Sequence, residues 1–182
     1  MKMATIHEFN QITKDAFIEQ LEGIFEHARW LAEQAAAGRP YHSPDELFRK
    51  MVKMVEDSGE DRKRELIRAH PDLGGRMRMS AHSASEQRES GLQNLTKEEY
   101  TKFQRANEKY KKKFGFPFIL AVRGKNKEEI YAAMRERLCH SSEQEFQTAL
   151  EQIYQIAYFR FTALFNQSNE NGGNSDEFGS TE

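Results

Sequence analysis

The sequence predicts an all-α fold: a single-domain helical bundle of about seven to nine helices with one buried extended segment. Helix start signals recur along the chain, each a capping residue followed three positions later by glutamate. Between these signals, apolar residues are spaced by three and four positions, the period of an amphipathic helix. Residues 116–122 are the exception, because they combine a proline with consecutive large apolar residues, which favours an extended and buried segment.

Seven helices follow in order from these signals. The first is expected to start at Thr13, to carry its apolar face at residues 17, 21, 24, 28 and 31, and to end at Gly38. Ser43, with proline at the next position, begins the second. The remaining helices are expected to begin near residues 60, 83, 96, 126 and 142, and residues 77–81 to be irregular. Capping boxes are predicted for Ser83 with Glu86, Thr96 with Glu99, Asn126 with Glu129, and Ser142 with Glu145.

The extended segment at 116–122 has no partner strand elsewhere in the sequence. Its backbone N–H and C=O groups therefore need other partners if the segment is buried. Side chains, water or a ligand could supply them, and the alternative is a loop threaded through the core.

Composition excludes several classes of protein. Cys139 is the single cysteine, so neither an intrachain disulfide nor a zinc cluster is expected, and a reducing, cytoplasmic location is favoured. The formal charge of −2 gives no general footprint for nucleic acid. The longest apolar run is too short to span a membrane, and the N-terminus lacks the apolar core of a signal peptide.

The chain divides into a helical domain, residues 1–165, and a polar end. Residues 166–182 are almost free of large apolar side chains and cannot bury enough surface to offset the entropy of ordering. They are predicted to be a disordered tail or an interdomain linker.

His70 is the first candidate for chemistry. Pro71 pushes it out of the α region, so the helix before it must end there, and Gly74 and Gly75 follow. The partial negative charge of a helix C-terminus favours a protonated imidazole, which suits an acid/base group. The other interpretation is a capping histidine that bonds the last carbonyls of its helix.

Glu86 and Arg160 are the other two candidates. Glu86 could simply complete the capping box of Ser83. Arg160 lies in an apolar stripe of the last helix, so it must either extend to water or meet a buried carboxylate or anionic ligand. Histidine, glutamate and arginine in one helical pocket would suit a small anion.

Longer motifs resemble one enzyme family, the 2-oxo-4-hydroxy-4-carboxy-5-ureidoimidazoline (OHCU) decarboxylases. The resemblance covers roughly residues 5–165 in the right order. The motifs are Ala69-His-Pro-Asp-Leu-Gly-Gly-Arg76, Ser83-Ala-Ser-Glu-Gln-Arg-Glu-Ser-Gly-Leu92, Lys113-Phe-Gly-Phe-Pro-Phe-Ile-Leu-Ala-Val-Arg-Gly124, Leu21-Glu-Gly-Ile-Phe-Glu-His-Ala-Arg-Trp30 and Glu151-Gln-Ile-Tyr-Gln-Ile-Ala-Tyr-Phe-Arg160.

The resemblance implies a carboxy-lyase that takes the last step of urate degradation and forms (S)-allantoin. It implies catalytic roles for His70, Glu86 and Arg160. It implies substrate contacts from the same Glu86 and Arg160 together with Pro71, Ser83, Gln87, Phe118, Ile119, Leu120, Ala121 and Val122. It also implies a homodimer that needs no metal or organic cofactor, and in some bacteria a fused or associated urate oxidase.

Two other functions remain open from the residues alone. A non-catalytic helical interaction domain would use His70 as a cap and pair Arg160 with Glu86 structurally. A hydrolase of another ureide would use the same pocket for different chemistry.

Overall fold

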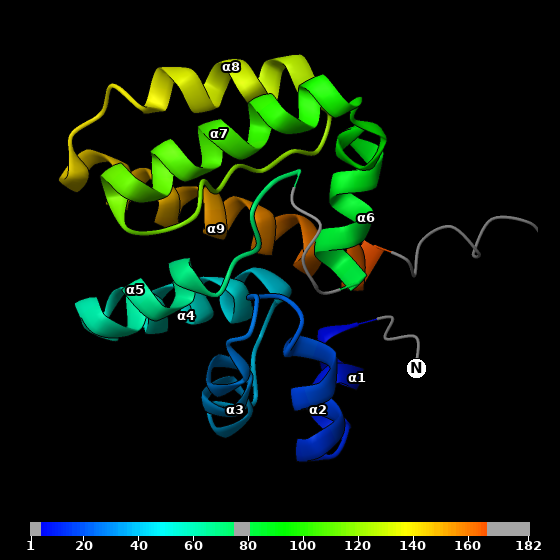
Figure 1. The fold of residues 1–182 in the computed structure, drawn as a ribbon. Coiled ribbons are helices and arrows are strands. Elements are labelled where there is room, and N and C mark those ends of the chain that lie inside the picture. The colour runs from blue at the N-terminus through cyan, green and yellow to red at the C-terminus, as the bar shows by residue number, and fades with distance from the viewer. Residues whose placement is uncertain (1–4, 75–80, 167–182) are drawn as a thin grey trace, which may run out of the picture.

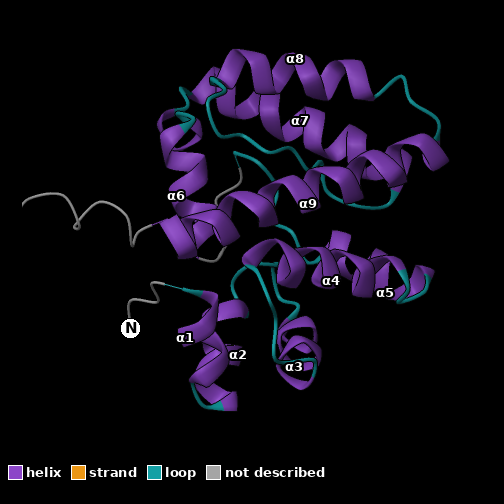
Figure 2. Ribbon diagram, turned by 180° about the vertical axis from the view of Figure 1, so that it is seen from behind, coloured by secondary structure: helices purple, strands orange, loops and turns teal. Residues whose placement is uncertain are grey.

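The computed structural model describes residues 5–74 and 81–166, and within them the chain is helical with no strand (Figure 2). The all-α prediction is therefore confirmed. The elements are α1 (Ile6–Gln11), α2 (Lys14–Leu21), α3 (Arg29–Ala37), α4 (Pro44–Glu56), α5 (Glu60–Arg68), α6 (Ala81–Glu89), the 3₁₀ turn η1 (Leu92–Asn94), α7 (Lys97–Phe114), α8 (Lys127–Arg137) and α9 (Ser142–Asn166).

Helix α9 runs through the middle of the arrangement (Figure 1). It contacts α4 and α5 on one side and α7 on the other, and α8 packs on α7. The first three helices lie beyond α4, and α6 stands across the end of the bundle. No helix among the described residues is long and apolar enough to cross a membrane. The predicted tail lies almost entirely outside the described part of the chain.

The first predicted helix is wrong, because two helices stand where one was expected. Helix α2 ends at Leu21 and α3 begins at Arg29, and the loop between them buries Ile24 and Phe25. His27 in this loop has a φ of 53°, a left-handed conformation that a right-handed helix cannot accommodate. The apolar spacing at 24 and 28 therefore reflects a buried loop. The short α1, begun by a capping box of Thr5 and Glu8, was not expected.

Two predicted capping boxes are also wrong. Helix α6 begins at Ala81, so Ser83 lies inside its first turn. The expectation of irregular structure at 77–81 therefore fails at Ala81, and its other positions fall outside the described residues. Helix α9 is capped by the hydroxyl of Ser141, which accepts from the backbone N–H of Gln144, while Glu145 is buried. In both cases the side chain that the local pattern assigned to a cap makes a tertiary contact instead. The boxes of Thr96 and Asn126 are confirmed.

The extended segment 116–122 is neither helix nor strand, and all its residues but Pro117 are buried, as predicted. Side chains supply partners for two of its backbone groups, and the backbone N–H of Lys125 donates to the carbonyl of Val122. Arg137 donates to the carbonyl oxygen of Ile119 at 2.6 Å, and the backbone N–H of Ala121 donates to Gln152 at 3.0 Å. The Arg137 guanidinium also lies 4.5 Å from the ring centroid of Phe118.

A buried carboxylate holds Arg137 in this position. Glu145, whose side chain is fully buried, accepts two hydrogen bonds from Arg137 and one from Tyr110. Nδ1 of His140 lies 2.7 Å from the other carboxylate oxygen. This cluster ties α7, α8 and α9 to the extended segment.

Arg137→Ala should therefore lower the free energy of unfolding by about 3–5 kcal/mol, because it leaves the buried Glu145 without its cation. Arg29→Ala is the matched control, since Arg29 is 55% exposed and pairs with Glu22 and Glu33 at the surface. Its loss should cost less than about 1 kcal/mol. Urea unfolding curves of both variants measure the two effects, and equal losses would contradict this assignment.

Candidate active site

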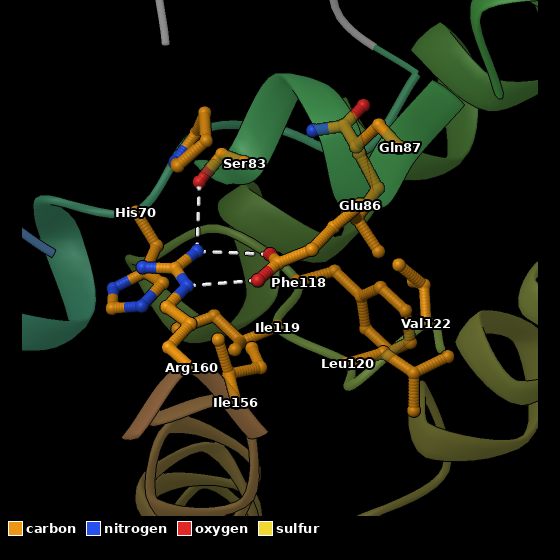
Figure 3. Close-up of a pocket in the computed structure, with 12 residues that line it drawn as sticks. His70, Ser83, Glu86, Gln87, Phe118, Ile119, Leu120, Val122, Ile156 and Arg160 are labelled. Carbon is orange, nitrogen blue, oxygen red and sulfur yellow. Dashed lines mark hydrogen bonds and ion pairs between the residues drawn. The ribbon is translucent and has the colours of Figure 1, made fainter. Parts of the chain in front are cut away.

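One pocket brings together nearly all the residues expected at the site (Figure 3). Its walls come from the end of α5, from α6, from the extended segment and from α9. The lining residues are His70, Pro71, Leu73, Ser83, Glu86, Gln87, Phe118, Ile119, Leu120, Val122, Ile156 and Arg160. Ala121, the remaining expected contact, lines an adjoining pocket with Glu86, Val122, Ile156 and Arg160.

The apolar wall of the pocket comes from the extended segment. Phe118, Ile119, Leu120 and Val122 lie together beside the polar groups, with Ile156 of α9 below them (Figure 3). The carbonyl of Ile119 and the N–H of Ala121 already have protein partners. The segment is thus fixed in place by contacts on α8 and α9.

His70 directly follows the C-terminal cap of α5 and is 7% exposed. Its Nδ1 lies 2.9 Å from the carbonyl oxygen of Leu66, so Nδ1 carries a proton and donates. Burial is the main cause that lowers the pKa of His70 to about 4, against the opposing effects of the Leu66 contact and Glu26. The ring is therefore neutral near pH 7, with an unprotonated Nε2.

This neutral state corrects the expectation of a protonated imidazole. The helix C-terminus favours the cation, but the loss of hydration in a buried pocket outweighs it. The capping contact and the pocket position occur together, so the two interpretations of His70 do not exclude each other.

Arg160 is buried, with a side chain only 3% exposed, so the interpretation that it extends to water is wrong. Its Nε and Nη2 each donate to Glu86 at 2.8 Å, and its Nη1 donates to Glu26 at 2.9 Å. Further acceptors are the hydroxyl of Ser83 at 3.2 Å and the carbonyl of Gly23 at 3.3 Å. Burial lowers the pKa of Arg160, but the two carboxylates outweigh it and hold the pKa above its ordinary value.

Glu86 is the partly exposed member of this cluster, at 28% of its side chain. Both of its oxygens bond the Nε–Nη2 edge of Arg160 (Figure 3), so the predicted role in a capping box is wrong. The site therefore holds a bidentate carboxylate–guanidinium pair in contact with the pocket.

Gln87 fixes the corner that carries His70. Its Oε1 accepts from the N–H of Gly74 at 2.9 Å, and its Nε2 lies 3.4 Å from the carbonyl oxygen of Asp72. Gly74 has a φ of 69°, and a Cβ there would come within 3.1 Å of Leu95. The left-handed conformation therefore favours glycine, and any larger residue would also have to displace the Leu95 side chain slightly.

The sequence reasoning missed Glu26, which lies in the loop between α2 and α3. It is 2% exposed, and its Oε2 accepts from Ser83 and from Arg160 at 2.9 Å each. A signal was present, because this acidic residue directly follows Phe25 and lies two positions after Ile24, which belonged to the predicted apolar face. Buried acids usually have a polar partner, so this position predicts one.

Among the described residues, no group of three or more histidine, cysteine, aspartate or glutamate side chains could hold a metal ion. The polar groups that line the pocket are an uncharged imidazole, one carboxylate, one guanidinium, a hydroxyl and an amide. Such a set can orient an anionic or polar ligand and move one proton through Nε2 of His70.

Comparison with known proteins extends over nearly the whole chain. A 2-oxo-4-hydroxy-4-carboxy-5-ureidoimidazoline decarboxylase of Haloferax volcanii is 41% identical over 165 residues, which cover 91% of this chain and 98% of that protein. The uric acid degradation bifunctional protein of Bacillus subtilis is 42% identical over 168 residues. The match covers 92% of this chain but 34% of that longer protein.

Solved structures share the fold. A crystal structure of (S)-allantoin synthase superposes with a TM-score of 0.69 at 33% identity, covering 88% of this chain and 54% of that one. An OHCU decarboxylase crystallised with (S)-allantoin gives a TM-score of 0.67 at 22% identity, which supports the fold alone. The family model described as OHCU decarboxylase matches residues 10–162. The chain therefore belongs to the OHCU decarboxylase family.

Proposed function

We propose that this chain is a decarboxylase that converts 2-oxo-4-hydroxy-4-carboxy-5-ureidoimidazoline into (S)-allantoin and carbon dioxide. Family membership supports the reaction class. The observation that carries the proposal for this chain is the pocket itself, where a neutral histidine and a carboxylate-paired arginine meet an apolar wall.

The substrate supplies its own electron sink. Its carboxylate is attached to a carbon that also bears a hydroxyl and lies next to a ring C=N bond. When the bond to the carboxylate breaks, carbon dioxide leaves and the electron pair passes into that C=N bond. No carbanion-stabilising cofactor is needed for this step, so the protein has to orient the ring and move protons.

His70 is proposed to move the proton. With Nδ1 bonded to Leu66, the lone pair of Nε2 can accept the proton of the substrate hydroxyl as that carbon becomes a carbonyl. The imidazolium then returns a proton to the neighbouring ring carbon on one face. Solvent supplies the one further proton that the ring nitrogen takes up, which balances the loss of the carboxylate charge.

Arg160 and Glu86 are proposed to orient the substrate. The planar guanidinium can hold polar oxygens of the substrate bidentately. Glu86 brings a second negative charge close to the substrate carboxylate, which disfavours the ground state relative to the product. Ser83, Gln87, Pro71 and the 118–122 segment complete the proposed contact surface.

Assembly and context belong to the same proposal. A homodimer is implied by the family resemblance, and a reducing, cytoplasmic location is consistent with the single cysteine. Residues 166–182 are proposed to be a disordered tail or linker. The bifunctional relatives in Bacillus support a further domain or partner for urate degradation.

The observed contacts also suit a non-catalytic interaction domain, because Arg160 pairs with Glu86 and His70 bonds the end of α5. Product analysis separates the proposals. The native protein should release carbon dioxide and give optically active (S)-allantoin, whereas spontaneous decay of the substrate gives racemic product. Release of ammonia would indicate a ureide hydrolase. Racemic product at saturating enzyme would refute the decarboxylase, provided that authentic (S)-allantoin stays optically active under the same conditions.

His70→Asn should reduce kcat by about 10²–10⁴-fold, the usual contribution of a general acid–base group. The asparagine amide can still donate to the Leu66 carbonyl, but it has no counterpart to the basic Nε2. Steady-state kinetics on freshly prepared substrate measure the loss, and circular dichroism checks the fold. Near-native turnover by a folded variant would show that His70 only caps α5 and takes no part in catalysis.

The neutral state of His70 makes a separate prediction about stability. Because burial lowers its pKa to about 4, the unfolded chain, with a pKa of about 6.5, takes up a proton first as the pH falls. Stability is therefore lost as the pH drops from 6.5 toward 4. Relative to His70→Asn, the native protein should lose about 2 kcal/mol between pH 7 and pH 5. Urea unfolding at both pH values tests this, and parallel pH dependence of the two proteins would count against a buried neutral ring.

A further inference from the structure

Arg160 is held from two sides by carboxylates that differ in exposure. Glu86 binds the Nε–Nη2 edge with a side chain that is 28% exposed, whereas Glu26 binds Nη1 with a side chain that is 1% exposed. The bidentate geometry, the strongest for a carboxylate on a guanidinium, is found at the edge bound by Glu86, whereas Glu26 makes one bond to Nη1. Glu86 therefore occupies the Nε–Nη2 edge, where a ligand carboxylate could bind bidentately. Glu26 binds Nη1, on the buried side of the guanidinium.

The pocket beside His70 is small while this pair is closed. Its volume is about 30 Å³, the room of about one water molecule. The adjoining pocket, of about 180 Å³, shares Glu86 and Arg160 with it. Val122 and Ile156 also line both pockets, and of these four shared residues Glu86 alone is not buried, so its side chain has the most freedom to move.

We propose that Glu26 is a positioning residue: it keeps the Arg160 guanidinium in place from the buried side while Glu86 leaves the opposite edge to admit an anionic substrate. The inference rests on the proposed decarboxylation. Exchange of Glu86 for a substrate carboxylate then preserves both the charge and the bidentate geometry at that edge. The Nη1 contacts with Glu26 and Gly23 do not take part in the exchange.

The loop between α2 and α3 is shaped for this contact. A Cβ on Gly23 would lie 3.2 Å from the ring of His82 on α6, so glycine allows the loop to approach α6 closely. Ser83 donates to Glu26 and accepts from Arg160, closing a ring of three side chains. An apolar core of similar volume would be about as stable as a buried ion pair, so stability alone does not require this arrangement.

The test compares two substitutions of Glu26 in the full chain. Glu26→Gln keeps an oxygen that can accept from Arg160 and Ser83, whereas Glu26→Ala removes it. We expect kcat to fall about 100-fold in Glu26→Ala, the effect of a misplacement of about 1 Å at the reacting centre. Glu26→Gln should stay within about tenfold of the native kcat. KM should change less than kcat in both.

Val55→Ala is the matched control for lost stability. Val55 is fully buried in α4 and does not line the pocket, so its truncation lowers the melting temperature without moving Arg160. At a temperature where all variants are folded, its kcat should equal the native value. A native kcat in folded Glu26→Ala overturns the proposal. If Glu26→Ala does not fold, Glu26→Asp, which withdraws the carboxylate by one methylene, must show the loss instead, and a native kcat there overturns it.

A second measurement needs no turnover, so it separates failure of this inference from failure of the proposed reaction. In the free protein each carboxylate neutralises Arg160 when the other is absent. Glu26→Ala and Glu86→Ala together should therefore lower the urea midpoint by more than the sum of the single changes. Additive shifts would mean that Glu26 does not hold Arg160 once Glu86 is gone, which overturns the proposal.

Discussion

The burial of one cation, Arg160, constrains the rest of the site. A buried guanidinium without partners would cost several kcal/mol, so the chain must bring acceptors to it from elsewhere. They come from the loop after α2 and from α6, at Glu26, Gly23, Ser83 and Glu86. Three segments distant in sequence are thereby fixed relative to one another, and the pocket lies where they meet. The break between α2 and α3 allows the loop to present the Gly23 carbonyl and the Glu26 carboxylate to Arg160.

A second buried cation, Arg137, holds the extended segment that forms the apolar wall of the pocket. It bonds the carbonyl of Ile119, and Glu145 near the start of α9 holds it. Glu145 and Arg160 are both on α9, about 22 Å apart along the helix axis at 1.5 Å per residue. One straight element therefore carries the anchor of the extended segment and the central cation of the site. This explains why α9 is the longest helix and lies in the middle of the bundle (Figure 1).

Local pattern predicted much of this fold, and it failed where distant residues compete for the same side chain. The capping boxes at Thr96 and Asn126 formed because no buried group binds their glutamates; Glu99 also pairs with Lys127 at 2.6 Å, and this contact leaves its other oxygen on the backbone N–H of Thr96. Ser83 and Glu145 instead bind buried groups. His70, Glu86 and Arg160 could be singled out by residue type, but not the neutral ring or the bidentate pair, since both depend on burial. Glu26 could not be assigned a partner at all, because its contact to Arg160 spans most of the chain.

The net charge of the site affects both the binding of an anionic substrate and the barrier to its decarboxylation. With His70 neutral, Glu26 and Glu86 outnumber Arg160, so the formal charges of these four groups sum to −1. An anionic substrate is then not drawn in by net attraction, and its affinity must come from exchange with Glu86 and from the apolar wall. Under the proposed reaction the substrate charge disappears as carbon dioxide leaves. A surplus of negative charge disfavours the bound carboxylate more than the state in which its electrons have moved into the ring, and that difference lowers the barrier. A protonated His70 would cancel the surplus. Under the proposed reaction, the burial that keeps the ring neutral would therefore favour both proton transfer and the departure of carbon dioxide.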